Sequence, residues 1–214
     1  MADSWIPTGC VVVAGLKSEA ALLPKGCRVA ISGGDPERLE VLLASLPDDV
    51  THVLSFGVAG GLDPCTRSGD IFVATSLATA TGRFTCDAPW RKAIALRTGA
   101  KPAILAASDT LLQSASQKAA LHLASSAAAV DMESGVAARF AAKRGAEFAV
   151  LRAVADGPNE TLPSVAAVGL HPDGSPAPLR VMAALARRPW ELPSLLRLAR
   201  ASAKAHAALK VALS

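Results

Sequence analysis

Short runs of β-branched residues alternate with Ala- and Leu-rich stretches along most of this chain, and this alternation limits the fold more than any other feature. Buried parallel strands read as continuous apolar runs, and the helices between them supply the crossovers. The pattern predicts an α/β fold, with residues 1–214 forming a single domain in which helices flank a mixed or parallel sheet. We expect strands over residues 11–14, 28–32, 52–56, 71–75, 103–106 and 148–154, and helices over residues 19–23, 36–45, 90–96, 117–124 and 132–143.

The composition favours one apolar core and gives no sign of a nucleic-acid partner. Of the 214 residues, 51% are hydrophobic and 4% are aromatic, and none is tyrosine. This supplies enough apolar surface for one substantial core, built mainly from Ala, Val, Leu and Ile. The formal net charge is +4, but the basic residues are not interleaved with aromatic residues that could stack on bases. We therefore predict that the protein does not bind nucleic acid.

The cysteines and histidines indicate neither a metal site nor disulfides. The four cysteines form no C-x-x-C pair, and the four histidines are scattered along the chain. We interpret the thiols as structural and expect no metal. The N-terminus shows no basic segment followed by a long apolar run, and no stretch reaches transmembrane length. We expect a cytoplasmic protein.

Proline and glycine become frequent after Ala155, and no clear period continues beyond that point. Residues 157–178 are predicted to form a loop, which is either a lid over a cleft or an ordinary surface loop. Residues 179–214 are predicted to form C-terminal helices, divided near Pro189 and Pro193.

A glycine cluster follows the strand predicted over residues 52–56. The segment 55–62 reads SFGVAGGL, and its glycines would let the backbone turn sharply and approach a ligand closely. Open α/β sheets bind ligands at the carboxyl ends of their strands. A tight turn packed against a neighbouring element is the alternative interpretation.

The segment 32–38 reads SGGDPER and contains the parts of a phosphate site. Gly33 and Gly34 are flexible, the helix that follows offers free N–H groups at its start, and Arg38 lies in its first turn. The alternative needs no ligand, because Asp35 is a natural N-cap and Pro36 suits the first helical position.

Three acidic residues stand where predicted strands and helices meet. Glu133 opens a helix, and its carboxylate can accept hydrogen bonds from two vicinal hydroxyls of a sugar. Asp156 ends an apolar strand, where burial would raise its pKa and suit it to donate a proton. Glu19 opens the first helix and is a candidate to activate water or to stabilise a positive charge. Helix capping, helix-dipole stabilisation and turn formation are the alternatives for these acids.

The order of these segments resembles the purine nucleoside phosphorylase and nucleosidase superfamily. The matching segments are Gly15–Glu19, Ala59–Gly61, Gly69–Val73, Met132–Glu133 and Ala155–Asp156. The resemblance runs from the first strand to about Asp156. It implies a nucleoside phosphorylase-like fold that uses no cofactor, with inorganic phosphate as an optional co-substrate.

The resemblance also implies a role for each matched residue. Met132 would pack under the ribose, Glu133 would hold its hydroxyls and Asp156 would protonate the departing base. Glu19 would activate the attacking water or stabilise the positive charge on the ribosyl ring. The residues that line the base and ribose would be Ala59, Gly60 and Leu111. Gly33, Gly34 and Arg38 stay the candidates for phosphate binding, on the glycines and helix start described above.

Over nearly its full length the chain looks most similar to the hopanoid-associated phosphorylase branch, which acts on the lipid-bearing nucleoside adenosylhopane. The supporting segments are residues 32–35, 55–64, 130–134, 168–174 and 188–200. This resemblance implies that adenosylhopane is cleaved at its N-ribosidic bond, with release of adenine, in hopanoid lipid biosynthesis. One alternative is a methylthioadenosine or adenosylhomocysteine nucleosidase. Another, of a different class, is a non-catalytic nucleoside-binding or membrane-docking protein.

Three positions depart from the superfamily pattern. Val58 stands where related enzymes often carry a serine that contacts phosphate or water, and Ala155 replaces the serine that usually precedes the aspartate. Leu111 stands where methylthioadenosine nucleosidases commonly carry a base-stacking phenylalanine. These changes bear on phosphate use and on specificity for small thio-nucleosides. Phosphorolysis and hydrolysis both stay open, and the resemblance favours phosphorolysis.

The helix predicted from Trp190 onward carries basic and apolar side chains. Arg197, Arg200 and Lys204 share one face by their spacing, and leucines with Ala199 supply apolar surface. Such a helix suits the surface of an anionic leaflet. Packing against the core is the alternative. We predict weak contact with the inner membrane through the C-terminal helices, and a homodimer as the assembly.

Overall fold

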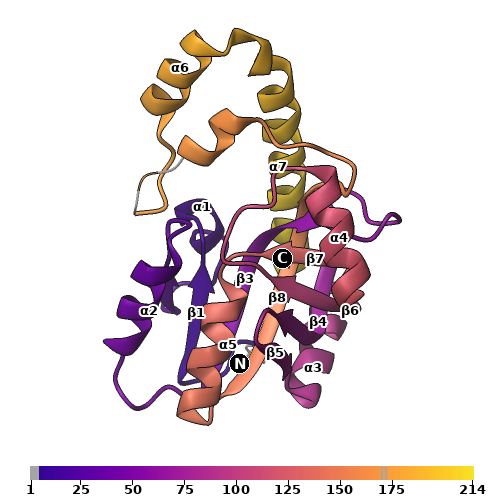
Figure 1. The fold of residues 1–214 in the computed structure, drawn as a ribbon. Helices are drawn as coiled ribbons and strands as arrows, with labels where there is room; N and C mark the ends of the chain where they lie inside the picture. Colours follow the sequence, from indigo (N-terminus) through magenta and orange to yellow (C-terminus); the bar gives the residue numbers. More distant parts are fainter. Residues whose placement is uncertain (1–4, 170, 172) are drawn as a thin grey trace.

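The computed structural model describes residues 5–169, 171 and 173–214. These residues form an eight-stranded sheet with helices on both faces (Figure 1). The strands are β1 (Cys10–Ala14), β2 (Arg28–Ile31), β3 (His52–Gly61), β4 (Ile71–Thr79), β5 (Gly82–Thr85), β6 (Lys101–Ala107), β7 (Ala129–Asp131) and β8 (Glu147–Asp156). The helices are α1 (Lys17–Ala20), α2 (Pro36–Ala44), α3 (Ala88–Thr98), α4 (Ala115–Ser125), α5 (Ser134–Arg144), η1 (Ser164–Val168), α6 (Pro178–Arg187), η2 (Pro189–Glu191) and α7 (Leu192–Leu213).

The sheet is mixed, and five of its strands close into a ring. Strands β2, β1 and β3 pair in parallel, and β3 also pairs in parallel with β8. Strand β8 pairs antiparallel with β4, which pairs in parallel with β6, and β6 pairs in parallel with β7. The ring is completed where β7 pairs antiparallel with the end of β3. The end of β3 therefore pairs with both β7 and the end of β8.

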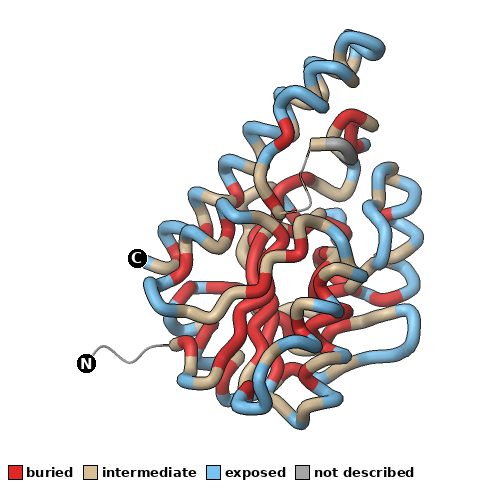
Figure 2. Tube along the Cα trace, turned by 90° about the vertical axis from the view of Figure 1, so that its left-hand side faces the viewer, coloured by how far each residue is buried: buried red, intermediate tan, exposed pale blue. Residues whose placement is uncertain are grey.

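Alternate residues of the central strands pack against different helices. In β1, Val11 and Val13 share a core cluster with Leu39 of α2, whereas Val12 shares a second cluster with Leu209 of α7. All three valines are completely buried. This explains why β1 reads as an unbroken apolar run, because helices cover both of its faces. Figure 2 shows the buried strands between helices with exposed outer surfaces.

The α/β fold class and the six predicted strands are confirmed, and β5 and β7 are additional. The turn expected at the glycine cluster is wrong, since β3 continues through Gly57 and ends only at Gly61. Pairing with β8 and β7 satisfies the backbone of this segment, which no local pattern reveals. A register shift between Ala59 and Gly60 marks a β-bulge opposite the end of β8.

The five predicted helices are present, with boundaries moved by a few residues. The largest consequence is at α5, which begins at Ser134, so that Met132 and Glu133 lie in the connection from β7. Asp131 ends β7 just before this helix, and its Oδ1 accepts the backbone N–H groups of Glu133 at 2.9 Å and Ser134 at 2.7 Å.

The connection from β8 to α6 contains η1 and returns to α1. The backbone N–H of Lys17 donates to the carbonyl of Gly174 at 3.1 Å, and Lys17 Nζ lies 2.6 Å from Asp173 Oδ2. Leu170 and Pro172, within the stretch compared above with the hopanoid-associated branch, lie outside the described residues.

The C-terminal helices differ in how they contact the rest of the fold. Helix α6 stands apart from the sheet, and α7 runs from there back along the molecule (Figure 1). No residue of α6 is buried, whereas Ala205, Leu209 and Ala212 in the second half of α7 are. Helix α7, which carries Arg197, Arg200 and Lys204, is therefore partly a core helix, because its second half packs on β8. In the part of the chain that the structure describes, no helix is long and apolar enough to cross a membrane.

Candidate active site

A cavity of about 230 Å³ lies where β1, β3, β6 and β8 end. The residues predicted from the sequence that line it are Glu19, Gly34, Ala59, Gly60, Leu111, Met132, Glu133 and Asp156. They come from distant parts of the chain: β1, β3 and β8 are parallel and end at the same edge of the sheet, and the ring of strands brings the ends of β6 and β7 to the same place. The structure therefore brings all three candidate acids into one cavity.

The proposed phosphate cradle reaches this cavity only through Gly34. Gly33 and Arg38 are not among the residues that line it. The backbone N–H of Gly33 donates to the carbonyl of Gly15 at 3.0 Å, and that of Arg38 donates to Asp35 Oδ1 at 3.1 Å. Asp35 thus caps α2, as the interpretation without a ligand expects.

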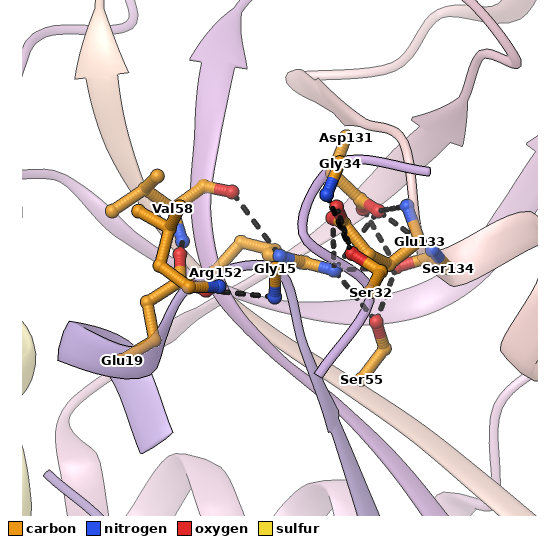
Figure 3. Close-up of polar contacts among 11 residues, drawn as sticks. Gly15, Glu19, Ser32, Gly34, Ser55, Val58, Asp131, Glu133, Ser134 and Arg152 are labelled. Atoms are coloured by element: carbon orange, nitrogen blue, oxygen red, sulfur yellow. Dashed lines mark hydrogen bonds and ion pairs between the residues drawn. The ribbon is translucent and has the colours of Figure 1, made fainter. Parts of the chain in front are cut away.

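Glu19, in α1, is 1% exposed, and three backbone N–H groups fix its carboxylate (Figure 3). Oε2 accepts from Gly15 at 2.9 Å and from Leu16 at 2.8 Å, while Oε1 accepts from Val58 at 2.7 Å. Burial raises the pKa of Glu19, and the nearby charge of Arg152 opposes that rise. The side chain is held in one orientation before any ligand arrives.

Two glycines leave room for the carboxylates. A Cβ on Gly57, which has φ = +147°, would overlap the carboxylate of Glu19. A Cβ on Gly15 would lie 2.9 Å from Glu133 Oε1 and 3.5 Å from Glu19 Oε2. Glu19 and Glu133 therefore approach the backbone at the same point, and any larger residue at Gly15 would displace Glu133.

Glu133 is 8% exposed and is held by a serine and an arginine. Its Oε1 accepts a hydrogen bond from Ser32 Oγ at 3.1 Å, and its Oε2 lies 3.4 Å from Arg152 Nη2. Burial raises the pKa of Glu133 to about 7; Asp131 and Glu19 add to the rise, and Arg152 and Ser32 oppose it. A small change in surroundings can therefore switch the charge of this group near neutral pH.

Arg152 lies behind Glu133 and organises the polar contacts there, although no motif in the sequence marks it. It is 1% exposed, and its Nη2 donates to Ser55 Oγ at 2.6 Å and to Asp131 Oδ1 at 2.9 Å. Its Nη1 donates to the carbonyl of Val58 at 3.2 Å, and its Nε is buried with no acceptor among the described residues. The available signal was a lone charge within the apolar run of β8, because a buried guanidinium needs partners.

Asp156 also lines the cavity and pairs with Lys118 of α4, a residue that no sequence motif marks. Lys118 Nζ contacts Oδ2 of Asp156, and the two residues are 1% and 6% exposed. Burial raises the pKa of Asp156, Lys118 opposes the rise and Glu160 adds to it. No sequence signal separates Lys118 from a solvent-facing lysine on a short helix.

The cavity is thus lined by Asp156, which pairs with Lys118, and by Glu19 and Glu133, with the buried Arg152 against Glu133. A carboxyl with a raised pKa can donate a proton, and fixed carboxylates stabilise positive charge that develops nearby. Within the described residues, no group of three His, Cys, Asp or Glu side chains could hold a metal ion.

The family model described as "Phosphorylase superfamily" matches residues 37–173 of the chain. This range includes Glu133, Arg152 and Asp156, and Glu19 precedes it. No curated protein matches the sequence.

Solved structures with the same fold include several nucleosidases. The 5'-methylthioadenosine/S-adenosylhomocysteine nucleosidase from Neisseria meningitidis has a TM-score of 0.69 and 17% identity, over 95% of this chain and 96% of that one. The Helicobacter pylori enzyme of the same description has a TM-score of 0.65 and 18% identity over the same shares. Futalosine hydrolase from Helicobacter pylori, in a mutant form, has a TM-score of 0.62 and 19% identity, over 71% of this chain and 89% of that one.

Proposed function

The chain belongs to the phosphorylase superfamily and is an enzyme of the nucleoside phosphorylase and nucleosidase class, and we propose that it hydrolyses the N-ribosidic bond of an adenine nucleoside. One observation carries this proposal. Three acids line the cavity: Glu19 and Glu133 lie together beside Gly15, with Arg152 against Glu133, and Asp156 pairs separately with Lys118.

This separation matches the charges that form when the bond breaks. The ribose becomes positive and the base becomes negative, so the reaction needs a proton at the base and negative charge near the sugar. In the proposed mechanism Asp156 protonates the leaving base. Glu133 holds the ribose hydroxyls above Met132, and Glu19 orients water and accepts its proton as the new C–O bond forms.

Water suits the cavity better than phosphate does. A phosphate dianion would be repelled by Glu19 and Glu133, and Val58 offers no hydroxyl to bind it. The groups that would attract it, Gly33 and Arg38, do not line the cavity. Phosphorolysis stays the alternative, with inorganic phosphate entering past Gly34.

Two kinds of 5' substituent fit the proposal. The similar solved structures support small thio groups, as in methylthioadenosine and adenosylhomocysteine. The resemblance to the hopanoid-associated branch favours adenosylhopane, whose lipid would need more space than the cavity offers. The apolar side chains Leu16, Leu111, Leu112 and Leu162 line the cavity and would contact either substituent.

The lipid-bearing substrate and the membrane contact are proposed together. Helix α6 exposes 83% of Leu179 and 64% of Met182. Residues 174–214 contain seven Lys and Arg and one acid, Glu191. An apolar and cationic surface of this kind suits an anionic bilayer, from which a lipid-bearing nucleoside could enter the cavity. We also propose a cytoplasmic homodimer, which analytical ultracentrifugation would test.

The experiment that tests the function is a substrate panel. Purified protein is incubated with methylthioadenosine, adenosylhomocysteine and adenosylhopane in detergent micelles, and adenine is measured by chromatography. Release from any of these supports cleavage of the N-ribosidic bond, and the ratio of kcat/KM values assigns the 5' group. Tight binding of all three without release of adenine would identify a non-catalytic nucleoside-binding protein instead.

A further inference from the structure

Lys118 is the cation buried nearest the proposed acid. It lies in α4, 1% exposed, and its ammonium group has three acceptors. One is Oδ2 of Asp156, and the others are the carbonyl oxygens of Gly157 at 2.8 Å and Glu160 at 2.9 Å. An ammonium group has three N–H donors, so all of them are engaged.

The engagement of all three N–H donors limits the roles that Lys118 can have. A buried cation is tolerated only when it is paired and hydrogen-bonded, and here both conditions hold. With its three donors engaged, Lys118 has none left for a substrate, although it lines the cavity. Any effect of Lys118 on the reaction must therefore act through Asp156 or through residues 157–160.

Resting on the proposed function, we propose that Lys118 is a positioning residue for the acid. It fixes the orientation of Asp156 towards the base and sets the pH above which the proton is no longer available.

The hydrogen bonds of Lys118 support the first part of the proposal, the orientation of Asp156. Lys118 holds Oδ2 of Asp156, which leaves Oδ1 as the oxygen available to the base. The same ammonium ties the carbonyls of Gly157 and Glu160 to α4, and Leu162 N donates to the carbonyl of Gln113 at 2.8 Å, just before that helix. The end of β8 and the start of the following connection are therefore anchored to one helix.

The charges near Asp156 support the second part of the proposal, the pH above which Asp156 loses its proton. Two charged side chains act on Asp156: Lys118 from α4 and Glu160 from the connection after β8. Burial raises the pKa of Asp156, Lys118 lowers it and Glu160 raises it. Because the acid works only when protonated, activity falls as pH rises through this pKa. Removing the cation should move that fall to higher pH, and removing the anion should move it to lower pH.

The test uses four variants of the full chain. Lys118→Met removes the charge at similar volume, Lys118→Gln keeps a hydrogen-bond donor without the charge, and Lys118→Arg keeps the charge. Glu160→Gln removes the opposite charge and preserves the carbonyl that Lys118 binds. For each variant, kcat and KM are measured against pH with the best substrate of the panel. Independently of activity, the carboxyl of Asp156 is titrated by NMR with ¹³C-labelled aspartate and assigned with Asp156→Asn.

The proposal predicts that Lys118→Met lowers kcat on the order of 100-fold, with a smaller change in KM. The titration midpoint of Asp156 should rise by about one pH unit or more in Lys118→Met and Lys118→Gln, and stay near wild type in Lys118→Arg. It should fall in Glu160→Gln. If Lys118→Met unfolds at lower temperature, Lys118→Gln and Lys118→Arg still separate charge from folding.

Two results would overturn the proposal. One is an unchanged midpoint and kcat when the charge is removed. The other is an equal loss of activity in all three Lys118 variants with no displacement of the midpoint, which would indicate a structural role alone. Failure of the proposed function looks different: the wild type would release no adenine, and the NMR titration would still report whether Lys118 governs Asp156.

Discussion

The carboxylate of Glu19 lies against the backbone of Gly57, at a place where a Cβ would overlap it. Gly57 has φ = +147° inside β3, a conformation that L-residues with side chains rarely adopt. The neighbouring N–H of Val58 donates to Glu19 Oε1 at 2.7 Å. One glycine therefore serves both the path of the strand and the position of a proposed catalytic carboxylate.

The first prediction separates the effect of Gly57 on the path of β3 from its effect on the position of Glu19. Gly57→Ala should lose about 1–3 kcal/mol of stability through backbone strain, and should also lose most turnover because Glu19 is displaced. Gly82→Ala is the matched control, since Gly82 has φ = +143° and nothing within 4 Å of its Cβ position. Thermal unfolding should show a loss in both variants, and kcat only in the first. Equal kcat in the two variants would remove Glu19 from the mechanism.

A second prediction concerns Asp156. Asp156→Asn should bind a substrate analogue nearly as well as wild type, whereas kcat should fall on the order of 100- to 10,000-fold, because an amide cannot donate the proton as a carboxylic acid does. Calorimetry gives the binding constant, and adenine release gives kcat. Asp63→Asn, on a partly exposed carboxyl outside the cavity lining, is the control. Turnover at the wild-type rate in Asp156→Asn would show that another group protonates the base.

The sequence predicted most of the sheet and the acids of the cavity, because both depend on local signals. Apolar runs indicated the strands. The acids that stand at or just after strand ends in the sequence line one cavity in the structure. The partners of those acids were not predictable in the same way. Lys118 and Asp156 are 38 positions apart and meet only through the fold, and Arg152 gave a signal only as a charge within an apolar strand. The glycine cluster was misjudged because its strand pairing is non-local.

The third prediction follows from the pKa of Glu133, which burial raises to about 7. The charged form of Glu133, which in the proposed mechanism accepts the ribose hydroxyls, is present above this pH and is lost as pH falls through it. KM should therefore rise as the pH drops below about 7, and more steeply than kcat changes. Glu133→Gln should have a high KM at every pH, and its KM should not rise further as the pH drops below about 7. A KM independent of pH in the wild type would mean that Glu133 does not bind the ribose in its charged form.

The fourth prediction tests the membrane surface. The protein should sediment with anionic liposomes at low salt and be released at high salt, because the attraction is electrostatic. Substitution is preferable to deletion after Pro189, since that deletion would remove the buried Leu209. Leu179→Ser with Met182→Ser should weaken binding. Leu96→Ser, on an α3 leucine that is 88% exposed, should not. Absence of sedimentation at low salt would exclude membrane contact from the mechanism.

The nucleophile is the central claim, and the dependence of adenine release on phosphate tests it most directly. Protein freed of phosphate is incubated with its best substrate, with and without added inorganic phosphate, and the sugar product is identified by mass spectrometry and ³¹P NMR. The account predicts the same rate in both conditions and a free ribose derivative as the product, because the carboxylates of Glu19 and Glu133, which line the cavity, would repel the dianion. Adenine release that requires phosphate, together with a sugar 1-phosphate as the product, would contradict it.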